Sequence, residues 1–259
     1  MTVLTPRPTS ADLVRGVVVA VLALVQVLVA ALGGSSIGDV ARDYDTPLLA
    51  ASWAFGIWGL IYLGFLGLAG FGLLPAQRAR EVQRRVGWWL AASAVLNSLW
   101  IAAFSARHVL LAELVLVALV VVLAVAFSRQ ARVPADGWAE RIAFRLPVSI
   151  YLGWSSVALV LGLMAAGDAV GLPDEGVLPQ TAAVLLLVIL AAVVLSVVGS
   201  SSGGIGGFAA AVVWALVGVA ANGRPVTVTV VAVLIAAVVV VQAARRIRRS
   251  VEPARIAVG

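Results

Sequence analysis

The chain has 259 residues, of which 63% are hydrophobic and only 12% charged, and its formal net charge is +6. Soluble globular proteins are about 45–50% apolar and about 25% charged, so this composition excludes an ordinary soluble enzyme, a disordered protein and a nucleic-acid-binding domain. There is no cysteine, a single histidine (His108), and arginine is the only basic residue type. Disulfides, a cysteine nucleophile, cysteine-ligated metals, a multi-histidine metal site within one chain and chemistry that needs a lysine amine are therefore excluded.

Eight apolar segments are each long enough to cross a bilayer as a helix. About 18 or more apolar residues suffice to span the hydrocarbon core, and only helices and closed barrels satisfy the backbone there. The segments are 16–32, 47–74, 86–104, 109–127, 146–166, 181–198, 205–221 and 226–244. The sequence therefore predicts an all-α polytopic membrane protein with eight transmembrane helices.

The distribution of arginine predicts the orientation of these helices. If the N-terminus is inside, all arginines except Arg42, Arg107 and Arg224 lie in the inner tails and loops, as the positive-inside rule requires. Eight spans also place both termini on one side. We therefore expect a bacterial inner-membrane protein with both termini cytoplasmic, because arginine without lysine suggests a high-GC bacterial genome. The first span is expected to remain uncleaved, although Ala31–Gly34 resembles a signal-peptidase site.

Polar residues within predicted spans are candidate functional residues, because they are costly in lipid. Glu113 is the only acid inside a span, and it either pairs with Arg107 at the outer helix end or lines a pocket. Asn97 either bonds to a neighbouring helix or contacts a ligand. Gln26 is the third such residue.

The tryptophans form two groups. Four of them, namely Trp53, Trp88, Trp89 and Trp138, lie near predicted helix ends or in a loop, as expected for an interfacial belt. The other group lies deeper and has aromatic or polar partners at helical spacing: Trp58 with Tyr62, Asn97 with Trp100 and Phe104, and Tyr151 with Trp154. Residues three, four or seven apart share one helix face. These faces either pack as a core or converge into a flat aromatic slot for a large planar apolar ligand.

Four stretches in these helices resemble the TspO family, the tryptophan-rich sensory proteins related to the mitochondrial translocator protein. They are Trp58-x-x-x-Tyr62 within an aromatic second helix, Leu96-Asn97-Ser98-Leu99-Trp100, Phe104-Ser105-Ala106-Arg107 followed by Glu113, and Tyr151-Leu152-Gly153-Trp154. The resemblance covers about residues 14–166. Gly162 stands where the family has an Asn late in its fifth helix.

The resemblance implies a five-helix bundle that binds a porphyrin, another tetrapyrrole or a sterol-like lipid, with roles in stress sensing or tetrapyrrole handling. It also implies the division of the chain: a TspO-like bundle at 1–166, three additional helices at 167–244 and a basic cytoplasmic tail at 245–259. The expected ligand site comprises Trp58, Tyr62, Asn97, Trp100, Tyr151 and Trp154, with Glu113 at its periphery. No resident cofactor is required.

Two other functions stay open. A small-solute transporter would have internal repeats and broken helices near the midplane, and no convincing repeat is visible. A membrane enzyme acting on a tetrapyrrole is disfavoured, because no acid–base pair, metal cluster or nucleophile–base set is visible.

Two groups of glycines complete the predictions. Gly64, Gly67 and Gly70 favour a close helix contact, within the chain or in a homodimer. The run of four glycines within residues 203–207 is expected to be a flexible inner turn.

Overall fold

The computed structural model describes residues 7–32, 37–223 and 225–259, and all regular elements in these ranges are helices. Eight helical segments are long and apolar enough to cross a membrane, which confirms the predicted fold class. Gly33, Gly34 and Arg224, on which parts of the cleavage and orientation arguments rest, lie outside the described residues.

The helices occur in the predicted order. They are α1 (Ser10–Leu32), α2 (Ile37–Arg42), the 3₁₀ segment η1 (Ser52–Gly56), α3 (Ile57–Leu73), α4 (Glu81–Ser105), α5 (Val109–Ala131), α6 (Gly137–Glu140), the π segment η2 (Arg141–Arg145), α7 (Leu146–Ala169), α8 (Val177–Ser200), α9 (Ile205–Asn222), α10 (Val226–Arg249) and α11 (Pro253–Val258).

The second predicted span starts later than expected. Residues 47–51 are not helical, and the α-helix begins only at Ile57 after the 3₁₀ turn. Pro47 cannot donate a backbone hydrogen bond, and the N–H of Ala51 donates instead to the carbonyl of Gly218 on α9, 2.9 Å away. The apolar composition of residues 47–56 therefore reflects burial of a connector rather than a longer helix.

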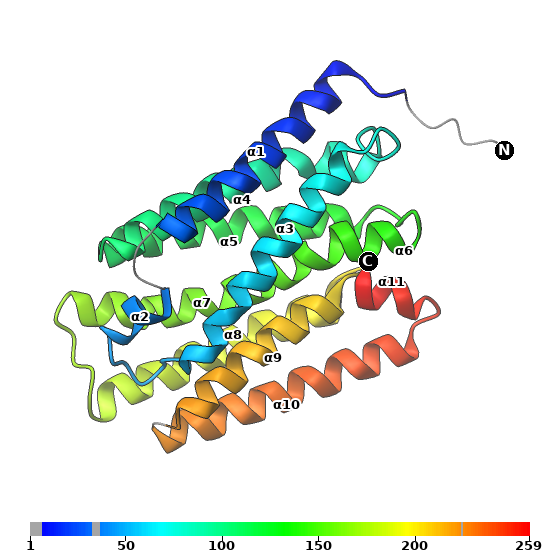
Figure 1. Cartoon of the computed structure of the whole chain (residues 1–259). Coiled ribbons are helices and arrows are strands. Elements are labelled where there is room, and N and C mark those ends of the chain that lie inside the picture. Colours follow the sequence, from blue (N-terminus) through cyan, green and yellow to red (C-terminus); the bar gives the residue numbers. More distant parts are fainter. Residues whose placement is uncertain (1–6, 33–36, 224) are drawn as a thin grey trace.

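Helix α7 is the centre of the bundle (Figure 1). It packs against α5 and α3 on one side and against α9 on the other, while α10 covers α9, and α8 packs mainly on α10. Helix α1 lies against α4 and α3. The start of α1 and the end of α10 lie at the same end of the bundle (Figure 1), as an even number of spans requires.

The outward faces of the long helices are apolar. Leu28 on α1, Leu114 on α5, Ile189 on α8 and Leu234 on α10 are all more than half exposed. Exposed leucine and isoleucine in such numbers would favour aggregation in water, whereas in lipid they are the expected contact surface.

A glycine lets α9 approach α7 closely. A Cβ atom at Gly153 would overlap the carbonyl oxygen of Phe208 and lie 3.0 Å from the Cβ of Ala211. Small residues at such crossings allow backbones to come into contact, which is a main source of helix association in membranes. Trp154, the next residue of α7, makes T-shaped ring contacts with Phe55 of η1 and Trp58 of α3.

Ion pairs with buried carboxylates lie near the starts of α1 and α7. Asp12 on α1 accepts hydrogen bonds from Arg15 (3.0 Å) and from Arg84 of α4 (2.7 Å). Arg145 pairs with Glu140 at 2.5 Å, and both side chains are almost fully buried. Because a buried charge without a partner is costly, these pairs hold α1 to α4 and η2 to α6.

The glycine-rich turn is closely packed. Gly204 has a φ of 77° and its N–H donates to the carbonyl of Arg255. Cβ atoms at Gly203 and Gly206 would lie 2.7 Å from the carbonyl oxygens of Arg255 and Ala257. The glycines therefore make room for α11, which folds back against the start of α9.

Candidate functional site

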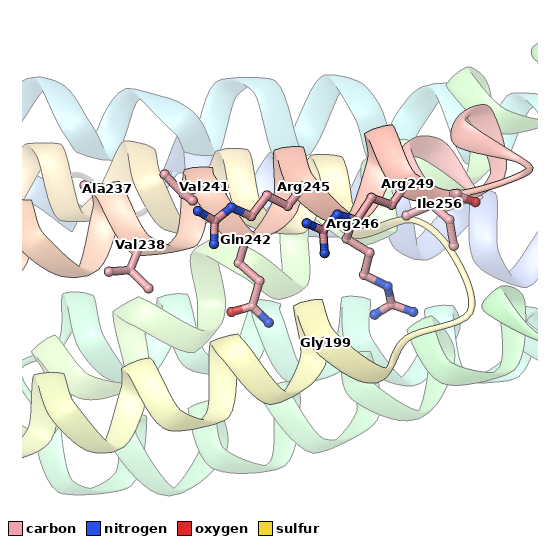
Figure 2. A pocket seen from close by; sticks show the side chains of 10 residues that line it. Gly199, Ala237, Val238, Val241, Gln242, Arg245, Arg246, Arg249 and Ile256 are labelled. Carbon is pink, nitrogen blue, oxygen red and sulfur yellow. The ribbon is translucent and has the colours of Figure 1, made fainter.

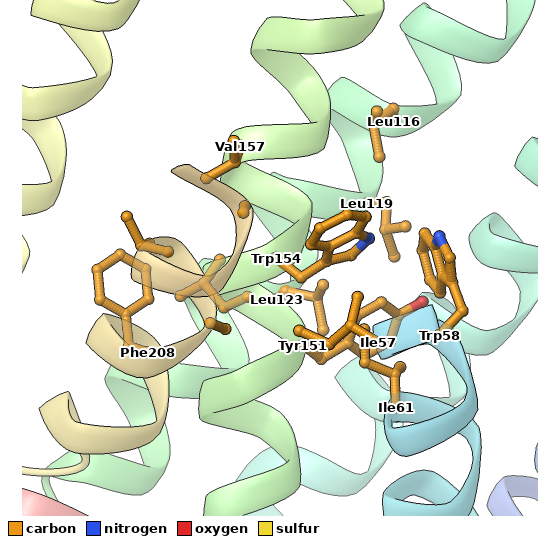
Figure 3. Packing of buried hydrophobic residues seen from close by; sticks show 14 of the residues in the cluster. Ile57, Trp58, Ile61, Leu116, Leu119, Leu123, Tyr151, Trp154, Val157 and Phe208 are labelled. Atoms are coloured by element: carbon orange, nitrogen blue, oxygen red, sulfur yellow. The ribbon is translucent and has the colours of Figure 1, made fainter. Parts of the chain in front are cut away.

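The predicted aromatic faces meet at Trp58. Its ring stacks on Trp100 of α4 (5.1 Å between centroids) and on Tyr62 (5.7 Å), and it meets the edges of Tyr151 and Trp154 of α7 at 6.1 and 6.2 Å. Figure 3 shows Trp58 facing Trp154 and Tyr151 across the interface of α3 and α7. Three helices thus bring their aromatic residues together in one cluster.

The rings fill most of the space between these helices. A largely enclosed cavity remains, with a volume of about 40 Å³. Drug-sized ligands occupy pockets of about 300–1,000 Å³, so this cavity, as the described residues form it, is too small for the large planar ligand expected from the sequence, because Trp58, Trp100 and Phe104 stack on one another.

Four of the seven predicted site residues line this cavity: Trp58, Trp100, Glu113 and Trp154. Tyr62, Asn97 and Tyr151 do not line it. Tyr151 lies behind the cavity wall, where its ring contacts the edges of Trp58 and Phe65.

The connector between α1 and α3 closes the cavity on one side. Ile37 and Ala41 of α2 line it, as do Tyr44, Thr46 and Leu48 of the following loop. Burial raises the pKa of the Tyr44 hydroxyl above its usual value. Sequence reasoning missed these residues, because a loop has no periodicity that would indicate which side chains point inward.

A second, more open groove lies on the other side of the connector. Its volume is about 530 Å³, and Tyr62, Ile101 and Ser105 line it together with residues of α2 and η1. Ile37, Phe55 and Trp58 line both this groove and the enclosed cavity. These three side chains therefore form the partition between the two spaces.

Glu113 is buried in the cavity wall and does not pair with Arg107. Arg107 instead donates to Asp43 of the connector, at 2.7 Å. The Glu113 carboxylate lies against Gly162 of α7, where a Cβ atom would overlap its Oε2. The predicted pairing of Glu113 with Arg107 is therefore wrong, because Asp43 accepts the hydrogen bonds of Arg107 and α7 offers space at Gly162.

Asn97 makes an interhelical contact. Its amide donates to Oε1 of Gln26 on α1, at 3.3 Å, and both side chains are fully buried. Asn97 thus connects α4 to α1.

Several polar atoms of the cluster have no hydrogen-bond partner within the described part of the chain. They are Trp58 Nε1, Tyr62 OH, Tyr151 OH, Trp154 Nε1 and Glu113 Oε1. Buried polar groups without partners are rare in folded proteins, and they are costlier inside a membrane. The cluster is therefore one place in the bundle where bound donors and acceptors would be stabilising.

The remaining tryptophans lie at the surface or near it. Trp53, Trp88 and Trp138 are 46%, 52% and 60% exposed, and the Arg129 guanidinium lies over the Trp89 ring. Trp214 of α9, which the sequence did not single out, donates to the carbonyl of Ala54 at 2.9 Å and meets the Trp53 ring edge. It fixes η1, and therefore the start of α3, against α9.

No cluster of three or more metal-ligating side chains occurs among the described residues. The arrangement at the cluster instead offers aromatic faces and a few donors and acceptors. This combination suits an apolar ligand with polar edges.

A family model described as TSPO-like protein matches residues 13–245. The chain belongs to the TSPO-like family. The match continues through α8, α9 and α10, whereas the residue motifs reach only about residue 166, so the last three membrane helices lie within the family match as well. Neither the search of curated proteins nor the search of solved structures gives a match for this TSPO-like chain.

Proposed function

We propose that this membrane protein binds a planar apolar ligand, such as a tetrapyrrole, in the aromatic cluster between α3, α4 and α7. The observation that carries the proposal is a set of buried polar atoms on Trp58, Trp154 and Glu113 that have no hydrogen-bond partner among the described residues, and all three residues line one cavity. A ligand with polar edges would give these atoms partners, while the indole rings stack on its faces.

Binding of a ligand of this size requires the partition to open. The enclosed cavity holds about 40 Å³ and the neighbouring groove about 530 Å³. Movement of Ile37 and Phe55, which belong to the connector and η1, would join the two spaces around Trp58. The joined space would fall in the range of ligand pockets, about 300–1,000 Å³.

The residues of the site have different roles in this proposal. Trp58, Trp100 and Trp154 contact the ligand, and Glu113 accepts a hydrogen bond from it or donates one. Tyr62 lines the neighbouring groove that the ligand would enter, while Asn97 and Tyr151 pack against neighbouring side chains and keep the rings in place. The protein acts by binding or sensing, in a bacterial inner membrane with both chain ends in the cytoplasm.

A transporter is the less favoured function. Transporters carry discontinuous helices near the membrane midplane. In the described residues, the non-α segments Ser52–Gly56 and Arg141–Arg145 lie towards the starts of their spans.

The test is a titration of the detergent-purified protein with protoporphyrin IX, followed by tryptophan quenching and porphyrin absorbance. We expect saturable binding that Trp58→Leu, Trp100→Leu and Trp154→Leu each weaken by about tenfold or more, as loss of a stacked aromatic contact predicts. Trp88→Leu is the matched control, because Trp88 is half exposed on α4, and it should bind like the wild type.

A further variant tests the partition. Phe55→Ala removes a ring shared by the cavity and the groove, so porphyrin should bind faster than to the wild type. Equal binding by the wild type and all variants would overturn the proposed site, and absence of any binding would overturn a tetrapyrrole as the ligand.

A further inference from the structure

A groove with a volume of about 930 Å³ lies between the last turns of α8 and α10 (Figure 2). It shares no residue with the aromatic cavity. Ala237, Val238 and Val241 form an apolar half, and Arg245 and Arg249 lie at the other half. The groove is therefore amphipathic along its length.

The groove lies where α10 would cross from the hydrocarbon core of a membrane into its headgroup layer. Arg245 lies nineteen residues after Val226, the first residue of α10, which corresponds to a rise of about 28 Å. The hydrocarbon core is about 30 Å thick. Val238 and Val241, which are 49% and 45% exposed, thus lie at the level of acyl chains, whereas the arginines lie at the level of headgroups.

Two polar side chains of the groove already have partners on α8. Gln242 donates to the carbonyl of Leu195 at 3.0 Å, and Arg246 donates to the carbonyls of Ser201, at 2.5 Å, and Val198. The positive charge of Arg246 is favourable here because the carbonyls at the C-terminal end of a helix carry partial negative charge. These two residues hold α10 against α8 and form the floor of the groove.

Arg245 and Arg249 are different, because their side chains have no hydrogen bond or ion pair within the described part of the chain. They are four residues apart, so they lie on one face of α10 with a separation of about 6 Å along the axis. Like charges at this spacing repel each other. An anion between the two guanidinium groups would remove this repulsion.

We propose that this groove binds one anionic phospholipid, with its headgroup phosphate between Arg245 and Arg249 and its acyl chains along Val238 and Val241. Guanidinium groups bind phosphate oxygens in pairs of parallel hydrogen bonds, and basic pockets between membrane helices bind anionic headgroups. The apolar half of the groove distinguishes a lipid from a free phosphate ion, which has nothing to place there.

Native mass spectrometry of the full chain tests the proposal. Dioleoylphosphatidylglycerol or dioleoylphosphatidylcholine is added to the protein in detergent, and the lipid that stays bound after the detergent is removed in the spectrometer is measured. We expect one tightly retained phosphatidylglycerol and weaker retention of phosphatidylcholine. The double variant Arg245→Gln/Arg249→Gln should lose about tenfold or more in affinity for phosphatidylglycerol. The matched control is Arg132→Gln/Arg248→Gln, which removes the same charge from exposed positions outside the groove and should retain the lipid.

Three outcomes would overturn the proposal. Equal losses in the two double variants would mean that the Arg-rich end attracts anionic lipid without a defined site. Equal retention of both lipids would show that the net charge of the headgroup does not determine binding in the groove. Competition by glycerol phosphate at concentrations similar to the lipid would mean that the arginines bind a soluble anion. Helical circular dichroism and a monodisperse elution profile establish that each variant is folded.

Discussion

The carboxylate of Glu113 on α5 occupies the space that a side chain at Gly162 on α7 would need. Glu113 is the only acid inside the 109–127 segment, and Gly162 replaces the Asn expected from the family resemblance. The two features therefore belong together, because the missing side chain on one helix makes room for the polar group of the other.

Gly162→Ala should destabilise the protein by about 1–3 kcal/mol, since an added methyl group in a packed interior forces its neighbours apart. Glu113→Ala in the same chain should remove most of this cost, as expected for two residues in direct contact. Reversible unfolding in mixed detergent micelles measures both effects. Gly67→Ala on α3 is the control, because no atom lies within 4 Å of its added Cβ. Additive effects of the two variants would show that Glu113 and Gly162 do not share this space.

Gly153→Ala should weaken the packing of α9 on α7. The added Cβ would overlap the carbonyl oxygen of Phe208, and a backbone atom cannot move away as a flexible side chain can. We expect a loss of stability of about 1–3 kcal/mol and a change in tryptophan fluorescence, because Trp154 follows directly. Gly167→Ala, at which the nearest atom is 3.4 Å from the new Cβ, should change neither quantity.

Asn97→Leu should lower stability by about 0.6–2 kcal/mol, the range measured for interhelical hydrogen bonds in membranes, because it removes the bond to Gln26. Gln26→Leu should have a similar effect, and the double variant should cost less than the sum. Porphyrin affinity should change far less than in Trp58→Leu. A stably folded Asn97→Leu variant that lost porphyrin binding would instead assign Asn97 a direct ligand contact.

The orientation of the bundle can be tested with single cysteines, since the chain has none of its own. We expect Asp174→Cys, in the loop between α7 and α8, to react with a membrane-impermeant maleimide in intact cells. Arg248→Cys, near the end of α10, should react only after the cells are opened, because the arginine-rich end is predicted to be cytoplasmic. The reverse labelling pattern would contradict the orientation.

The three glycines of α3 lie in different surroundings. Gly64 lies against Pro147 of α7, so its close contact is within the chain, whereas Gly67 and Gly70 have no atom within 4 Å of an added Cβ. The homodimer through these glycines stays a prediction.

The sequence by itself determined the class of the protein and the course of its helices. Hydrophobic length predicts a transmembrane helix because lipid requires each spanning backbone segment to satisfy its own hydrogen bonds. The spacing of Trp58 from Tyr62, of Trp100 from Asn97 and of Trp154 from Tyr151 likewise predicted a shared face on each helix, since an α-helix repeats every 3.6 residues.

Only the tertiary structure decided what these faces enclose. The stacking of Trp58 on Trp100, the connector side chains over the cavity and the contact of Glu113 with Gly162 depend on how far apart three helices lie and how they are rotated. The same holds for the groove between α8 and α10. Periodicity specifies which residues share a face, but the distance between two faces is set by the side chains of both helices packing together, which no single segment contains.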